Sequence, residues 1–423
     1  MKKRINLVLE EALANIKKSG EDLREIDSEQ KKFTDKLKKN LKKLKVSAEV
    51  FVGGSFAKKT IMSKKSYDVD IFIRFMKGTG DISRITGKAL KGFKGIETLH
   101  GSRDYFRIRI KNNLFFEIIP VVKVKSPKEA ENITDLSYFH VRYIKNKIKS
   151  RKIIDEILLA KKFCYANNCY GAESYISGFS GYALELLIYN YKSFLNFIKS
   201  LSKGTDKIII DIEKFYRNRQ ELMMNLNSSK LKSPVILIDP TYKQRNALAS
   251  LSDDTFRKFR EACREFLRNP KSEAFEIKKL EPEKAKNEAK KKGYGFAIVR
   301  LTTNRQEGDI AGSKLLKFHR HLKEEIRKYF EIKDGWFEYD DKKSSRSFFV
   351  AKSRKEILIS GPRKDNQDNV MKFKKEHKNI FIKNGRVFAK EKVNFGAGEF
   401  LKNWKQKNRK KMNEMSIEEM EVN

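Results

Sequence analysis

Residues 52–60 read V-G-G-S-F-A-K-K-T, and residues 67–73 read Y-D-V-D-I-F-I. The pattern predicts a strand, a tight Gly-Gly-Ser turn, a short helix and then a second strand. Successive side chains of a strand point to opposite faces, so Asp68 and Asp70 should lie side by side, opposite the apolar face that carries Val69. We therefore expect an N-terminal α/β unit with two carboxylates on one face of its sheet.

The same stretch predicts a phosphate-binding turn next to these acids. Two adjacent glycines let backbone N–H groups approach a phosphate closely, and the following helix offers the positive end of its dipole. Metal-dependent phosphoryl or nucleotidyl transfer uses this combination of a phosphate cradle and paired acids. A D-x-D strand or a Gly-Gly turn alone is often only a surface feature, but their order and spacing here favour a catalytic interpretation.

The composition points to a folded protein with an anionic partner. The chain has 423 residues, which is enough for roughly two to four domains. Hydrophobic residues make up 39%, which suffices to build cores. Lys and Arg total 94 against 55 Asp and Glu, so the net charge is +39. Nucleic acid is the obvious partner for this excess, although a general bias toward lysine would also produce it.

The cysteines and the N-terminus indicate a protein of a reducing compartment. Cys164, Cys169 and Cys263 are too few for a disulfide framework, so we expect free thiols. The basic N-terminus has an apolar run over residues 5–9, which ends at Glu10 and is too short for a signal peptide or a membrane span. We therefore expect a soluble, cytoplasmic protein with no membrane association.

Residues 1–150 predict an α/β unit that begins with two amphipathic helices. The expected strands lie at residues 48–53, 67–75, 105–110 and 114–119. Asn112-Asn113 suits a hairpin turn between the last two strands.

The rest of the chain predicts a helical part and then a second part with sheet and helix. Residues 151–268 are mostly helical in pattern, with a single short strand at 234–240. From residue 269 the composition changes, and the charged stretch 278–292 is typical of a linker or an exposed helix. Beyond it we expect a strand over 296–301, a helix over 310–330, strands near 336–339, 347–351 and 356–359, a hairpin turning at Asn384-Gly385, and a helix or frayed tail from residue 405. The predicted fold class is α+β multidomain.

Several motifs carry a resemblance to a known family. The G-G-S turn followed by D-x-D resembles the signature of the polymerase-β-like nucleotidyltransferase superfamily. More specific motifs resemble the archaeal-type (class I) CCA-adding enzymes, which are CCA tRNA nucleotidyltransferases. These motifs are I-T-D-L-S-Y-F-H at 133–140, Y-G-A-E at 170–173, G-F-S-G-Y at 178–182 with E-L-L-I at 185–188, D-P at 239–240 with R-N-A at 245–247 and L-S at 251–252, and, nearer the C-terminus, G-P at 361–362, N-V at 369–370 and N-G-R at 384–386. The similarity touches nearly the whole chain, is strongest from 52 to 252 and is weak over 278–345.

The resemblance implies a three-part architecture and a reaction. Residues 1–150 would form a catalytic head, 151–268 a mostly helical neck, and 269–423 a body and tail that bind tRNA. The implied reaction is template-independent addition of C, C and A to the 3′ end of tRNA from CTP and ATP, with release of pyrophosphate. Two Mg²⁺ ions would serve this reaction, bridged by Asp68 and Asp70.

A third acid is needed in such a site, and a neighbouring strand should present it. Glu117 lies on the expected strand 114–119, with Phe115 and Ile119 on the same face. The resemblance gives Glu117 the family's third carboxylate position, where the family usually has Asp. Glu is one methylene longer, so the metal geometry would shift. The alternative is a surface glutamate on an edge strand.

The resemblance also implies a nucleotide site formed by the head and the neck. Its residues would be Gly54, Ser55, Lys58, Thr60, His140, Lys161, Tyr170 and Arg245. Lys58 replaces the family's usual Arg, so it would bind phosphate without the bidentate fork of a guanidinium. Arg245 would choose the base, because its fork can donate to cytosine N3 and O2 or to adenine N1. Lys162 is an alternative to Lys161, and His140 also fits a structural role.

The implied partner is tRNA, held by its acceptor stem and T-arm and recognised by shape and phosphate contacts. The candidate RNA-binding residues are Lys292, Arg300, Arg305, Arg346, Lys352, Arg354, Arg363 and Lys364. Each of them alone fits a solvated side chain, and together they predict a basic face. The resemblance is also compatible with a homodimer.

Two other interpretations fit the superfamily signature. One is a poly(A)- or oligoadenylate-forming nucleotidyltransferase, against which only the central and C-terminal motifs argue. The other is a catalytically inactive, basic RNA-binding module, against which the three acids argue.

Overall fold

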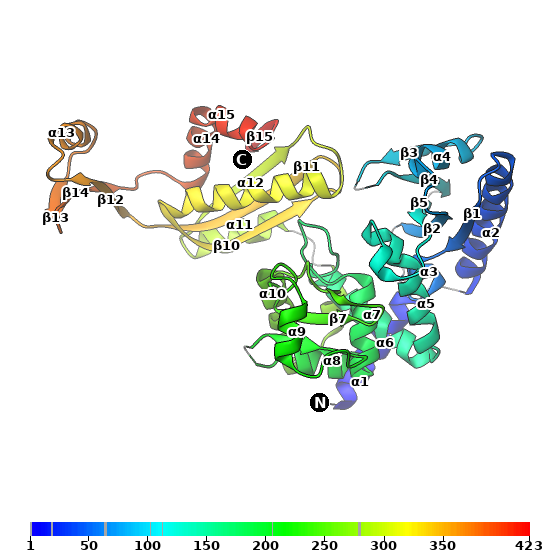
Figure 1. Cartoon of the computed structure of the whole chain (residues 1–423). Helices are drawn as coiled ribbons and strands as arrows, with labels where there is room; N and C mark the ends of the chain where they lie inside the picture. The colour runs from blue at the N-terminus through cyan, green and yellow to red at the C-terminus, as the bar shows by residue number, and fades with distance from the viewer. Residues whose placement is uncertain are drawn as a thin grey trace. The chain divides into compact units, whose positions relative to one another are not determined.

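The computed structural model describes residues 2–17, 20–62, 66–101, 103–111, 113–204, 206–277 and 281–423. The chain divides into two compact units, Met1–Lys278 and Lys279–Asn423 (Figure 1). Both units combine helices and strands, which confirms the predicted α+β multidomain class. Residues 278–280, at the start of the expected linker, lie outside the described residues.

The N-terminal unit contains a mixed sheet with the strand order β1-β2-β5-β4-β3. Its strands are β1 (Ala48–Val52), β2 (Tyr67–Phe75), β3 (Ile96–Leu99), β4 (Tyr105–Lys111) and β5 (Leu114–Val122). β2 and β5 run parallel, and the other neighbours are antiparallel. The sequence predicts these strands except β3, a short and largely exposed edge strand that gives no clear alternation. Asn112, of the predicted turn between β4 and β5, lies outside the described residues.

Helix α2 covers one face of this sheet, and the other face carries the acids. The helices here are α2 (Gly20–Lys43), α3 (Gly54–Ala57), α4 (Ile82–Ala89) and α5 (Ser137–Lys147), with 3-10 turns η1 (Pro127–Glu129) and η2 (Ile133–Leu136). Phe33 and Leu37 of α2 share a buried core with Val69 of β2, because an amphipathic helix buries its apolar stripe. Asp68 and Asp70 alternate with the core positions along β2 and therefore lie on the opposite face, as predicted.

The central part of the first unit is a helical bundle with a small sheet. Its helices are α1 (Lys2–Ile16), α6 (Arg151–Ala166), α7 (Gly181–Tyr191), α8 (Phe194–Leu201), α9 (Arg219–Asn225) and α10 (Asp253–Arg268), followed by the 3-10 turn η3 (Ser272–Phe275). The sheet has the order β6-β7-β8, with β6 (Ile208–Ile210), β7 (Val235–Asp239) and β8 (Tyr242–Asn246). The prediction of a single strand is wrong, because β6 and β8 are too short to give a local pattern and form by pairing with β7.

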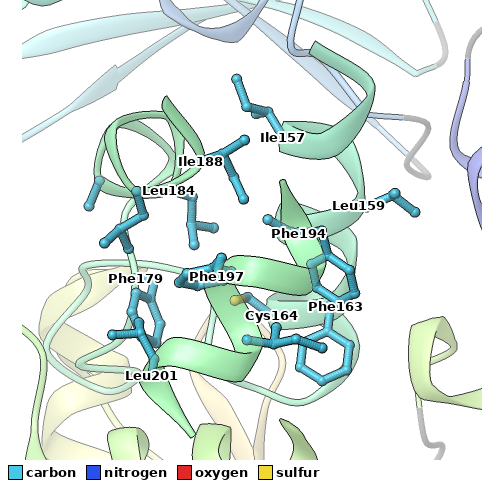
Figure 2. Close-up of a cluster of buried hydrophobic side chains, with 14 of the residues drawn as sticks. Ile157, Leu159, Phe163, Cys164, Phe179, Leu184, Ile188, Phe194, Phe197 and Leu201 are labelled. Carbon is cyan, nitrogen blue, oxygen red and sulfur yellow. The ribbon is translucent and has the colours of Figure 1, made fainter. Parts of the chain in front are cut away.

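Aromatic rings fill the centre of this bundle (Figure 2). The ring centroid of Phe163 in α6 lies 5.3 Å from that of Phe194 in α8 and 6.2 Å from that of Phe259 in α10. Ile5 and Ile16 of α1 belong to the same core, so the first helix packs with the central helices although its sequence falls within residues 1–150. This core fixes α6 and α7, which carry residues of the site described below.

The C-terminal unit contains two antiparallel sheets. The larger has the order β10-β11-β9-β15, with β9 (Gly295–Thr302), β10 (Phe330–Tyr339), β11 (Ser344–Ser353) and β15 (Glu419–Val422); the smaller has the order β12-β14-β13, with β12 (Glu356–Arg363), β13 (Ile380–Lys383) and β14 (Arg386–Lys392). The helices are α11 (Pro282–Lys291), α12 (Asp309–Arg327), α13 (Gln367–Glu376), α14 (Ala397–Lys407) and α15 (Arg409–Glu414). α12 lies along the larger sheet (Figure 1) and buries Phe318 and Leu322 against it. The tail is helical to Glu414, as expected, but then forms β15, which pairs with β9.

The three cysteines are free, as predicted, and all three are buried. Burial raises the pKa of the Cys169 thiol to about 12, so this thiol stays protonated at neutral pH. Among the described residues, no helix is long and apolar enough to cross a membrane.

Candidate active site

The glycine turn lies directly against one of the acids. Gly54 has a φ of +58°, and a Cβ atom there would lie 1.5 Å from Oδ2 of Asp70. The backbone N–H of Gly53 donates to the carbonyl oxygen of Asp70 at 2.8 Å. Only glycine fits position 54, because any side chain would displace the carboxylate. The helix α3 has only four residues, so it is too short to supply the helix dipole that the sequence analysis expects.

Three carboxylates meet on the open face of the head sheet. Asp68 and Asp70 lie on β2, and Glu117 of β5 is the direct cross-strand neighbour of Asp70. Burial raises the pKa of Asp70 to about 6, with Lys58 opposing and Asp68 adding to the shift. Burial and the charges of Asp70 and Asp68 raise the pKa of Glu117 to about 8. Grouped carboxylates that resist ionisation together are a donor set that a divalent cation would stabilise, so these residues fit the implied metal.

An arginine that the sequence analysis does not single out lies among these acids. Nη2 of Arg107, on β4, donates to Oδ1 of Asp68 at 2.8 Å, and its Nε lies 4.0 Å from Oε1 of Glu117. Among the residues that the structure describes, no three His, Cys, Asp or Glu side chains are already arranged to hold a metal ion.

A buried glutamate joins the predicted phosphate-binding residues. Nζ of Lys58 donates to Oε2 of Glu185 at 2.7 Å, and Nζ of Lys161 donates to Oε1 at 2.7 Å. The hydroxyl of Thr60 also donates to Oε1 at 2.7 Å. Burial opposes the ionisation of Glu185, but Lys161 and Lys58 lower its pKa to about 2. Glu185 thus links the turn of the head to α6 and α7 of the neck.

Lys58 and Lys161, which the sequence analysis expects to bind phosphate, both bind a carboxylate in this structure. Lys161 is buried, and Lys58 is largely so, with both ammonium groups bound to Glu185. Both lysines also act on Asp70, whose pKa their charges lower. The sequence analysis places Glu185 in a motif of the resemblance but gives it no role; its other signal is that it is the lone charge within the apolar run of α7.

A second buried acid, Asp239 at the end of β7, gathers the predicted base-recognition residues. Nη1 of Arg245 donates to Oδ2 of Asp239 at 2.5 Å, and Nε2 of His140 lies 3.1 Å from the same oxygen. The hydroxyl of Tyr182 donates to Oδ1 at 3.0 Å, and its ring stacks on His140 with centroids 4.0 Å apart. Burial opposes the ionisation of Asp239, yet His140 and Arg245 hold its pKa well below the usual range. Burial lowers the pKa of His140, so its ring is neutral near pH 7.

The other predicted nucleotide-binding residues lie near these two networks. Ser55 is half-buried in α3. A Cβ atom at Gly181 would lie 3.0 Å from the hydroxyl of Tyr170 and 3.7 Å from Nζ of Lys161. Burial and the charge of Glu185 raise the pKa of Tyr170. Lys162 is half-buried on α6. The structure therefore brings the predicted head and neck residues together.

The predicted RNA-binding residues all lie in the C-terminal unit and are exposed. They are Lys292, Arg300, Arg305, Arg346, Lys352, Arg354, Arg363 and Lys364. Arg300 and Arg346 are cross-strand neighbours on β9 and β11, and Nη2 of Arg346 donates to Glu338 at 2.8 Å. Nε of Arg305 donates to the hydroxyl of Ser416. The basic surface thus includes carboxylates as well as arginines.

The chain is similar to known tRNA nucleotidyltransferases. Residues 155–276 match the family model described as tRNA nucleotidyltransferase, second domain. The CCA-adding enzyme of Nanoarchaeum equitans is 44% identical over 211 residues, a match that spans about half of each chain (49% of this one and 52% of the relative). Those of Archaeoglobus fulgidus and Methanocaldococcus jannaschii are each 28% identical, over 94% and 91% of this chain and 88% and 87% of the relatives.

Solved structures show the same fold at low sequence identity. A cytoplasmic RNA terminal U-transferase superposes with a TM-score of 0.51 and 14% identity, covering 66% of this chain and 100% of that one. Cid1, described as an RNA terminal uridylyl transferase, gives a TM-score of 0.51 and 13% identity, covering 67% and 100%. At this level of sequence identity, the likeness to these structures shows the fold alone. By sequence, the chain is similar to archaeal CCA-adding enzymes over nearly its whole length, and its central part matches a tRNA nucleotidyltransferase domain.

Replacing Glu185 with the isosteric Gln tests the buried ion network. We expect Glu185→Gln to lower the free energy of unfolding by about 3–5 kcal/mol, because it leaves two buried ammonium groups without their counter-charge. Urea unfolding followed by far-UV circular dichroism measures the loss. Glu213→Gln is the matched control, because Glu213 pairs with Lys147 at the surface and should change stability by less than about 1 kcal/mol. Equal effects of the two substitutions would contradict a structural role for Glu185.

Proposed function

We propose that this protein adds C, C and A to the 3′ end of tRNA, using CTP and ATP and releasing pyrophosphate. The observation that carries the proposal is the contact of the Gly53-Gly54 turn with Asp70, next to Asp68 and Glu117, in a chain that is similar to archaeal CCA-adding enzymes. A poly(A)-forming enzyme would share the acids and the turn, but the central and C-terminal motifs favour CCA addition. The reaction would take place where tRNA is processed, in the cytoplasm.

Asp68, Asp70 and Glu117 would hold two Mg²⁺ ions, which when bound lower the pKa of the attacking 3′-hydroxyl and neutralise the triphosphate. The backbone of the turn and the hydroxyl of Ser55 would donate to the phosphates. Lys58 and Lys161 would supply positive charge, and Glu185 would hold their ammonium groups in place for this. An ammonium is a point charge, so Lys58 would orient the phosphates less tightly than an arginine.

Arg245 would choose the base without a nucleic-acid template. Asp239 binds one side of its guanidinium and so leaves the remaining N–H groups to donate to cytosine N3 and O2 or to adenine N1. Asp239 also binds His140 and Tyr182, whose rings stack on each other. These two rings would form a rigid wall of the proposed site.

The C-terminal unit would bind tRNA through the acceptor stem and the T-arm. The exposed cations on β9, β11 and β12 support this, because A-form RNA is held mainly through its backbone. We further propose that the protein can form a homodimer. Light scattering tests this oligomeric state.

One assay distinguishes the proposed function from its alternatives. The full-length protein is incubated with Mg²⁺, a tRNA that lacks its 3′ CCA, and CTP and ATP singly or together. We expect addition of two C residues with CTP alone and of one further A with both. Open-ended A tails would instead support a poly(A)-forming enzyme, and tight binding without addition would support an inactive RNA-binding module.

Glu117 is the third acid of the proposed site. We expect Glu117→Ala to lower the rate of nucleotide addition by about 100-fold or more, whereas Glu117→Asp retains activity because it keeps a carboxylate on the same strand. Single-turnover CTP incorporation measures both. Full activity of the alanine variant would remove Glu117 from the site.

Arg245 is the proposed base-selecting residue. We expect Arg245→Ala to reduce the preference for CTP and ATP over UTP and GTP by about tenfold, while tRNA affinity stays unchanged. Incorporation of each nucleotide, together with filter binding of tRNA, measures the two effects. Arg257→Ala, at an exposed position on α10, is the control. An unchanged nucleotide preference in the Arg245 variant would refute this role.

A further inference from the structure

Arg107 lies within the acidic face, where the proposed mechanism has no use for it. It is the cross-strand neighbour of Glu117, and its guanidinium binds Asp68 at 2.8 Å. A guanidinium and a metal ion both bind carboxylate oxygens, so they compete for Asp68. The competition follows from the placement of these side chains on β2, β4 and β5.

Two further contacts show how Arg107 is held. Its guanidinium carbon lies 4.1 Å from the ring centroid of Phe115, so one face of the fork is stacked on an aromatic ring. Its Nε atom is buried and has no hydrogen-bond partner among the described residues. A buried donor without a partner is unfavourable. Charge, rather than a complete set of hydrogen bonds, therefore keeps the guanidinium in this position.

We propose that Arg107 is the internal counter-cation of the acidic site and that a divalent metal ion displaces it from Asp68. This inference rests on the proposed function, since it assumes that Asp68, Asp70 and Glu117 bind the metal. Arg107 offsets the mutual repulsion of the acids before the metal binds. The cost of displacing Arg107 weakens the binding of the metal alone, which makes Arg107 a positioning residue.

Mn²⁺ binding to the full-length protein, measured by electron paramagnetic resonance, tests the proposal. The variant is Arg107→Met, which keeps a long apolar stem on Phe115 and removes the charge. The matched control is Arg109→Met, because Arg109 is on the same strand and lies 5.3 Å from the same ring. We expect Arg107→Met to bind Mn²⁺ about tenfold more tightly than the wild type. Arg109→Met should stay within about twofold, because solvent screens its charge.

Thermal unfolding supplies a readout that a merely structural role would not reproduce. In EDTA, Arg107→Met should melt below the wild type and the Arg109 control, and saturating Mn²⁺ should remove the difference. Weaker or unchanged Mn²⁺ binding by Arg107→Met, or a melting difference that Mn²⁺ leaves intact, would overturn the proposal.

A third variant separates failure of this proposal from failure of the proposed function. Asp70→Asn should abolish Mn²⁺ binding to the protein if the acids form the metal site. If Asp70→Asn has no effect, the proposed metal site is wrong and the role of Arg107 falls with it. If Asp70→Asn abolishes binding but Arg107→Met leaves it unchanged, only the counter-cation role is wrong.

Discussion

The site depends on the close approach of a backbone turn to a carboxylate. The hypothetical Cβ of Gly54 would overlap the side chain of Asp70, so the turn and the acid can meet only because this position is glycine. The hydrogen bond from Gly53 to the carbonyl of Asp70 fixes the same contact from the backbone. A phosphate on the turn and a cation on the acids would consequently be neighbours, which is the geometry that nucleotidyl transfer needs.

Two buried carboxylates extend this arrangement from the head into the neck. Glu185 binds Lys58 of the head and Lys161 of the neck, and Asp239 binds His140 and Arg245. A buried charge is costly unless it is paired, so each network strongly favours one relative placement of its members. The cations that we propose to meet the triphosphate and the base are thus positioned before either ligand binds.

Local pattern in the sequence predicts much of the fold. The alternation of Asp68, Val69 and Asp70 specifies β2 and its acidic face, and Asn384-Gly385 marks the hairpin between β13 and β14. The short strands β3, β6 and β8 are missed, because their stability comes from pairing with residues distant in sequence. The position of α1 in the central core is likewise decided by packing rather than by its own periodicity.

In the candidate site, too, local motifs predict some residues and contacts between distant parts of the chain decide the others. Motifs predict Asp68, Asp70, Glu117 and Arg245, whereas contacts across the fold bring Arg107 to Asp68 and Glu185 to Lys58 and Lys161. The most direct measurement is a crystal structure with Mn²⁺ and CTP, in which anomalous scattering locates the metal. We expect the manganese peak between Asp68 and Asp70, with the triphosphate on the turn at Gly54. A peak away from these acids, or a triphosphate bound elsewhere, would contradict the proposed site.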